Sequence, residues 1–93
     1  MYYVYILYSK KSETFYYGFT RDLRKRLIEH NQGMSRATKP FVPWKLVQYS
    51  AFEDEMKAKD FEKYLKTGSG KAFAYKRLLR TEKFKSRNGF AVP

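Results

Sequence analysis

The spacing of aromatic and β-branched residues along the chain predicts three strands. Residues 2–9 read YYVYILYS, residues 14–19 read TFYYGF and residues 44–52 read WKLVQYSAF. Such residues favour the pleated, half-buried surface of a sheet. Only the polar segment KKSE separates the first two runs, so we expect them to pair as an antiparallel hairpin.

The position of the hairpin loop decides which residues lie opposite each other. A four-residue loop over residues 9–12 pairs Tyr8 with Glu13 and places Tyr5 directly across from Tyr16. Because side chains alternate along a strand, each face of the hairpin then carries one set of residues. One face carries Tyr3, Tyr5, Thr14, Tyr16 and Gly18, and the other carries Val4, Ile6, Phe15, Tyr17 and Phe19.

Capping signals and helical periodicity predict three helices. Thr20 is a suitable N-cap for a helix that runs to about Asn31, where Gly33 stops it. A second helix is expected over residues 54–67 and a third over residues 70–79.

Together these elements predict an α+β domain. In the order ββαβαα, a small three-stranded antiparallel sheet is flanked by helices. We expect this domain to occupy residues 1–80 and to be followed by a basic C-terminal tail, residues 81–93. The chain contains no internal repeat and no linker long enough to divide it further.

The charge of the chain points to a polyanionic partner. Twenty lysines and arginines against nine acidic residues give a formal net charge of +11 over 93 residues. Such a charge destabilises the compact state by self-repulsion, and a nucleic acid relieves it. The sequence has no cysteine, which excludes disulfides and thiolate-ligated metal sites and fits a cytoplasmic location. No apolar run is long enough to span a bilayer, and we expect no membrane partner.

Two residues of the first helix lie at the border of its apolar face. At about 100° per residue, with Leu23 at zero, His30 falls near 340° and Arg26 near 300°. Lys25 falls near 200°, the ordinary position of a solvated cation. An arginine held at the border can grip a phosphate with its planar fork.

Glu62 has a similar position on the second helix. With Ala58 at zero, it falls near 40°, beside the buried face, where its oxygens can bind a hard divalent cation. Two tyrosines, a cation, an imidazole and a carboxylate have the parts for metal-assisted phosphodiester hydrolysis. Each part also has a structural reading: the tyrosines as core or rim residues, Arg26 as a salt-bridge or snorkelling residue, His30 as a satisfied structural group, and Glu62 as an i,i+4 partner of Lys66.

Four motifs in order resemble the GIY-YIG nuclease superfamily. They are YVYIL (3–7), YYG (16–18), DLRKRLIEHN (22–31) and KDFEKYLKTGSG (59–70). The resemblance is to its small stand-alone members, related to the N-terminal nuclease domain of the UvrC-type DNA-repair excision nuclease. It implies a divalent-metal-dependent endonuclease that hydrolyses phosphodiester bonds in DNA, selecting structure rather than sequence.

The resemblance also assigns roles to residues. Tyr5 and Tyr16 match the motif tyrosines, either of which could take a proton from water, and Arg26 matches the phosphate-binding arginine. His30 matches a position that is histidine in some members, and Glu62 matches the residue that holds magnesium or manganese. A phenol with a pKa near 10 is a poor base at neutral pH, so we expect Arg26 to lower it. Contacts with nucleic acid are expected from Arg21, Arg24, Asn31, Lys66 and Lys71.

Departures from the motifs suggest a weak or specialised nuclease. The usual first-motif glycine is Tyr3, the middle aliphatic residue of the second motif is Tyr17, and Phe19 replaces a lysine found in some active members. The alternative is a non-catalytic basic module that binds DNA or RNA through cations and exposed aromatic residues. DNA is favoured over RNA as the partner, although no residue visibly reads a 2′-hydroxyl. Without a second recognition domain, specificity would have to come from a protein partner.

Overall fold

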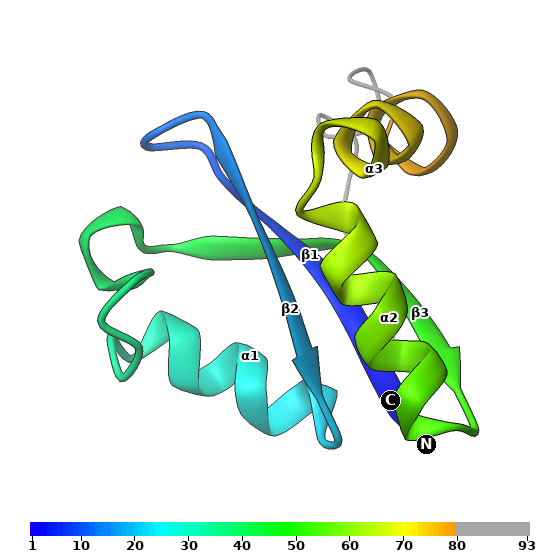
Figure 1. Ribbon diagram of the computed structural model, residues 1–93. Coiled ribbons are helices and arrows are strands. Elements are labelled where there is room, and N and C mark those ends of the chain that lie inside the picture. Colours follow the sequence, from blue (N-terminus) through cyan, green and yellow to red (C-terminus); the bar gives the residue numbers. More distant parts are fainter. Residues whose placement is uncertain (80–93) are drawn as a thin grey trace.

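A three-stranded antiparallel sheet forms the centre of the protein. The computed structural model describes residues 1–79, so the predicted tail lies outside the described residues. Strands β1 (Tyr2–Ser9), β2 (Thr14–Thr20) and β3 (Trp44–Phe52) are arranged in the order β2-β1-β3, as Figure 1 shows. The predicted α+β class and the three strands are confirmed.

The predicted register of the hairpin is wrong by two residues. Tyr5 lies opposite Gly18 rather than Tyr16, and Tyr16 lies opposite Leu7. The loop has four residues as expected, but it occupies residues 10–13, because Glu13 adopts a left-handed conformation (φ 57°) and its N–H donates to the Ser9 carbonyl at 2.7 Å. A shift of two residues keeps every side chain on its predicted face, since side chains alternate with a period of two.

Helix α1 (Leu23–Asn31) begins two residues later than its predicted cap implies. Asp22, not Thr20, is the N-cap, and its side chain accepts a hydrogen bond from the Lys25 N–H at 3.1 Å. Thr20 instead accepts from the Asp22 N–H. The predicted end of the helix is confirmed, with Gly33 at φ 76° directly after the C-cap.

The C-terminal half of the described chain is helical. Helix α2 (Glu55–Leu65) lies within the range predicted for the second helix. The third helical segment begins two residues earlier and is less regular than predicted: α3 (Gly68–Phe73) continues into a π-helical turn, Ala74–Leu78. A short 3-10 helix, Lys39–Phe41, interrupts the loop before β3.

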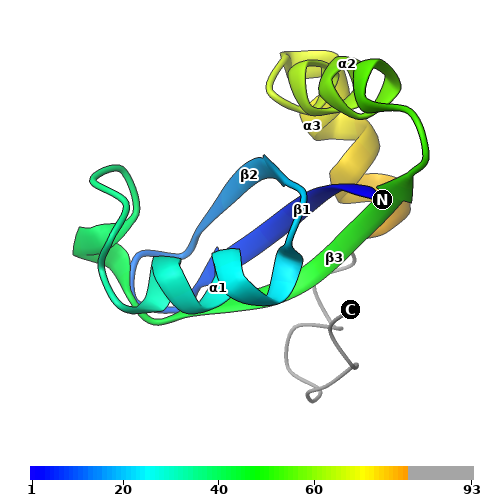
Figure 2. The same cartoon turned by 90° about the horizontal axis from the view of Figure 1, so that it is seen from below.

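The helices cover both faces of the sheet. Figure 2 shows α1 on one side, and α2 with α3 on the other. The core is divided accordingly. The cluster on the α1 side is built from Tyr5, Leu7, Leu23, Trp44 and Leu46. The cluster on the α2 side is built from Val4, Ile6, Ala58, Leu65, Ala74 and Leu79.

Asn31 fastens the end of α1 to the start of β3. Its side-chain oxygen accepts from the Trp44 N–H at 2.6 Å, and its Nδ2 donates to the Trp44 carbonyl at 3.0 Å. The Trp44 indole N–H in turn donates to the Thr38 carbonyl at 2.9 Å. These bonds fix the loop between α1 and β3 at both of its ends.

The Asn31 tether predicts a measurable loss of stability. Asn31→Ala leaves both Trp44 backbone groups without their partner, so we expect the free energy of unfolding to fall by about 1–2 kcal/mol. Urea denaturation followed by Trp44 fluorescence measures this. Gln32→Ala, an exposed neighbour, is the control and should change it by less than about 0.5 kcal/mol. Equal losses in the two variants would contradict the tether.

Candidate active site

The phenol of Tyr5 is the centre of the site. Tyr5 is only 2% exposed, and a Cβ built at Gly18 would overlap its Cζ and Oη atoms. The ring therefore lies across Gly18, and its hydroxyl extends over β2, the edge strand of the sheet. Any side chain at position 18 would have to displace the phenol, which explains the glycine of YYG.

His30 holds the Tyr5 hydroxyl from α1. Its Nε2 lies 2.8 Å from Tyr5 Oη, and its Nδ1 lies 2.8 Å from the Thr38 hydroxyl. The Thr38 hydroxyl donates in turn to the Ser35 carbonyl at 3.5 Å. This network assigns the ring proton to Nδ1, so Nε2 accepts the proton of the Tyr5 hydroxyl.

His30 is neutral at physiological pH. Its side chain is completely buried, and burial, aided by the positive charge of Arg26, lowers its pKa to about 4. The negative charge of Glu29 acts in the opposite direction but does not offset these effects. His30 is therefore a hydrogen-bonding group in the resting protein and not a cation.

Arg26 joins Tyr5 to Glu29. Its Nη1 donates to Glu29 Oε1 at 3.0 Å, and the guanidinium also hydrogen-bonds with the Tyr5 phenol. About a third of the Arg26 side chain is exposed, which leaves part of its fork facing solvent. An arginine held in this way presents its remaining N–H groups to an anion.

The expected acidification of Tyr5 is wrong for the resting protein. Burial is the largest effect and raises the pKa of Tyr5 to about 12. The hydrogen bond and charge of Arg26 lower it, as predicted, but Tyr16 and Glu62 raise it further. A phenol in a buried site keeps its proton unless charge is added nearby.

Tyr16 lies beside this network and is more accessible. Its ring centroid is 6.4 Å from that of Tyr5, 5.1 Å from that of His30 and 6.2 Å from that of Trp44. It is half-buried, whereas Tyr5 is fully enclosed. The two motif tyrosines therefore occupy one site but different environments.

Glu62 lies on α2, which packs on the other face of the sheet. Its carboxylate is near enough to the Tyr5 phenol to raise the pKa of that group. The side chain is 21% exposed, and one oxygen pairs with Lys66 Nζ at 3.0 Å. The i,i+4 pair with Lys66 considered from sequence is thus present, and the convergence of Glu62 with Tyr5 in one pocket stays a prediction.

The carboxylate suits a weakly held divalent cation. Magnesium is commonly bound through one or two carboxylates, with water and substrate phosphate completing its shell. Residues 1–79 contain no group of three or more His, Cys, Asp or Glu side chains that could enclose a metal. Glu62 with substrate oxygens fits the first pattern.

The residues predicted to contact nucleic acid lie in different surroundings. The Arg21 guanidinium lies over the Tyr2 ring, 5.5 Å from its centroid, and Lys71 is exposed on α3. Lys66 forms an ion pair with Glu62, and the Asn31 side chain accepts a hydrogen bond from the Trp44 backbone N–H. Arg24 is exposed on α1. Their contacts with nucleic acid stay predictions.

Sequence reasoning missed three members of the site. Thr38 lies in a loop with no periodic pattern, yet it is buried and holds His30. Glu29 follows Arg26 by three residues, a spacing typical of helical ion pairs that could have revealed it. Gly18 was expected on the same face as Tyr5, but its contact with the Tyr5 ring was not, because that contact depends on the hairpin register.

Comparison with known proteins identifies the family. The family profile described as the GIY-YIG catalytic domain matches residues 1–77. This chain belongs to the GIY-YIG family. The GIY-YIG domain implies a nuclease-type activity on nucleic acid, and the resemblance drawn from the four motifs is confirmed.

A curated relative supports the GIY-YIG assignment. The UPF0213 protein CPE1444 of Clostridium perfringens (strain 13 / Type A) is 42% identical over 67 residues, which cover 71% of each chain. No solved structure gave a significant match to this GIY-YIG protein. Within residues 1–79, no helix is long and apolar enough to cross a membrane.

The depressed pKa of His30 predicts a pH-dependent stability. The unfolded chain binds a proton near pH 6.5, and the native protein does so only near pH 4. The neutral imidazole therefore stabilises the fold fully above pH 6.5, and this stability is lost as the pH falls toward 4. Between pH 7.5 and 5.5 we expect a loss of about 1.3 kcal/mol from this group.

Urea denaturation at the two pH values, with His30→Gln alongside, tests this. The variant should be less stable at pH 7.5, but its further loss at pH 5.5 should be smaller than that of the wild type by the same amount. Parallel losses in the two proteins would show that His30 does not titrate in this way.

Proposed function

We propose that this GIY-YIG protein is a magnesium- or manganese-dependent endonuclease that hydrolyses phosphodiester bonds in DNA and selects its substrate by structure. One observation carries the proposal. The Tyr5 phenol interacts with Arg26, His30, Tyr16 and Glu62, although these come from different elements of the fold. A packing residue has no need of a cation and an imidazole at its hydroxyl, with a carboxylate within electrostatic range.

Each polar group has a place in the hydrolysis. Glu62 would hold the divalent cation, which supplies Lewis-acid stabilisation of the leaving oxygen. Arg26 offers its exposed N–H groups to the phosphoryl oxygens, where negative charge develops. The pair with Lys66 would have to open for Glu62 to hold a cation, and an i,i+4 pair whose lysine is exposed contributes little to stability.

Tyr5 and His30 act together. His30 fixes the direction of the Tyr5 hydroxyl through its Nε2, and Thr38 fixes the ring of His30. Tyr5 is the better positioned phenol, and Tyr16 is the one more open to water. One of the two takes the proton of the attacking water, and variants of each decide which.

Structure-selective action on DNA follows from what the surface offers. A net charge of +11 provides many contacts to phosphates, which position a duplex but do not read its bases. A protein partner could add specificity in the cytoplasm. The second candidate is a non-catalytic DNA- or RNA-binding module, which the Glu62–Lys66 pair and the high pKa of Tyr5 favour.

Substitution of Glu62 separates these functions. Glu62→Gln removes the charge that would hold the cation, so magnesium-dependent nicking of supercoiled and branched DNA should disappear while DNA binding is retained or tightened. Glu55→Gln is a matched control, because Glu55 also pairs with a lysine four residues later, Lys59 at 3.1 Å. Undiminished cutting by Glu62→Gln would exclude the metal role.

The phenols are tested in the same assay. Tyr5→Phe and Tyr16→Phe each remove one hydroxyl, and the one that performs acid–base chemistry should lose about 10²-fold or more in single-turnover rate. Tyr17→Phe, on the opposite face of β2, serves as the control. Losses below about threefold for both Tyr5 and Tyr16 would favour the binding module over the nuclease.

A further inference from the structure

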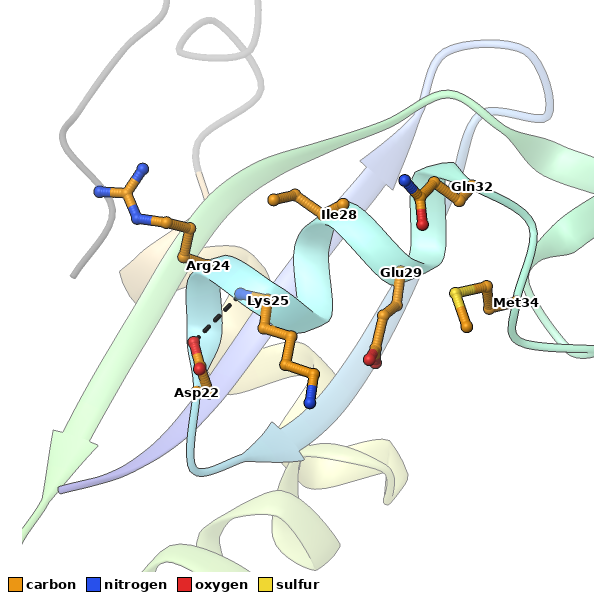
Figure 3. Close-up of a pocket in the computed structure, with 7 residues that line it drawn as sticks. All are labelled: Asp22, Arg24, Lys25, Ile28, Glu29, Gln32 and Met34. Atoms are coloured by element: carbon orange, nitrogen blue, oxygen red, sulfur yellow. Dashed lines mark hydrogen bonds between the residues drawn. The ribbon is translucent and has the colours of Figure 1, made fainter.

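A hollow lies beside α1 whose lining residues, apart from Glu29, have no role in the catalytic arrangement. Its volume is about 380 Å³, within the roughly 300–1,000 Å³ range of small-molecule sites. Figure 3 shows its lining, in which side chains project from α1 and from its two cap residues, and Met34 approaches from the following loop. The lining residues are Asp22, Arg24, Lys25, Ile28, Glu29, Gln32 and Met34.

The apolar part of the lining, which we call the floor of the hollow, consists of Ile28 and Met34. Ile28 is 50% exposed and Met34 is 65% exposed. Gly33, at φ 76°, turns the chain so that the Met34 N–H donates to the Glu29 carbonyl at 3.0 Å. This helix-ending motif often brings a residue at the Met34 position against one at the Ile28 position. The motif explains the turn, but both side chains remain open to solvent.

The polar groups around the floor favour an anionic ligand. Asp22 is occupied as the helix cap, and the carboxylate of Glu29 is engaged by Arg26. Within residues 1–79, the Lys25 ammonium forms no ion pair and the Gln32 side-chain amide forms no hydrogen bond. The hollow therefore presents the cations of Arg24 and Lys25, the Gln32 amide and an apolar surface, beside two carboxylates that are already engaged by the helix N-terminus and by Arg26.

Glu29 connects the hollow to the active site. The same carboxylate that lines the hollow pairs with Arg26, which hydrogen-bonds with Tyr5. A strand whose phosphate lies against Arg26 would thus carry a neighbouring nucleotide toward the hollow. A nucleotide combines the features that the lining matches: an anionic phosphate, a hydrogen-bonding base edge and an apolar base face.

We propose that the hollow is a subsite for one nucleotide of the strand bound at Arg26. Its base lies on Ile28 and Met34, Lys25 contacts its phosphate, and Gln32 hydrogen-bonds with the edge of the base. This subsite rests on the proposed function for its position relative to the cut phosphate. Its occupation can be measured without any cleavage.

The methionines make a direct test. Met34 and Met56 have nearly equal exposures, 65% and 67%, but Met56 is on α2, away from the hollow. Full-length Glu62→Gln protein labelled with ¹³C at the methionine methyl groups is titrated with a short single-stranded oligothymidylate and with an abasic strand of equal length. We expect the Met34 signal to shift with oligothymidylate only, and the Met56 signal with neither.

Other results would overturn the subsite. A Met34 signal that does not move while fluorescence anisotropy shows the strand bound would exclude contact with the base. Equal shifts with the abasic strand would show that only charge acts there. A shift that depends on protein concentration alone would assign the hollow to contact with a second copy of this chain.

Binding of a fluorescein-labelled oligothymidylate gives the second measurement. Met34→Glu should weaken it about tenfold more than Met56→Glu, the matched control with the same charge change. Equal weakening would contradict the subsite. If the wild type cuts no DNA but the Met34 signal responds to oligothymidylate, the proposed nuclease activity is excluded and the subsite is supported. If the wild type cuts DNA and the Met34 signal does not respond, only the subsite is excluded.

Discussion

The contact of the Tyr5 ring with the backbone of Gly18 is the constraint on which the site depends. It places the phenol over the edge strand β2, within the core cluster on the α1 side, and only a glycine leaves the space for it. His30 and Arg26 then meet the hydroxyl from α1, and Glu62 approaches from α2. The two helices lie on opposite faces of the sheet.

Burial gives this site its electrostatic character. The phenol and the imidazole are both enclosed and both held neutral, with pKa values of about 12 and about 4. Arg26 and Glu62 bring charge to their border while remaining partly exposed. A neutral, hydrogen-bonded pair beside charged groups is stable in the resting protein, and a phosphate and a cation would change that balance on binding.

Different sides of helix α1 contribute residues to the core, to the candidate active site and to the hollow. Its buried side carries Leu23 and His30 into the core, and Arg26 lies at the border of that side. Its outer side carries Lys25 and Ile28 along the hollow. Glu29 belongs to both regions, since it lines the hollow and holds Arg26. The cap at Gly33 ends the helix and sets the position of Met34 as well.

The sequence by itself determined the faces and the elements. Alternation placed Tyr5 and Tyr16 together, and the helical angle placed Arg26 and His30 at one border, because both patterns depend only on local backbone geometry. The hairpin register, the role of Thr38, the approach of Glu62 and the hollow came only from tertiary structure. Each of these features depends on contacts between segments that are distant in the sequence. The pKa of Tyr5 depends on how deeply the fold buries the phenol, and a local sequence pattern does not determine that burial.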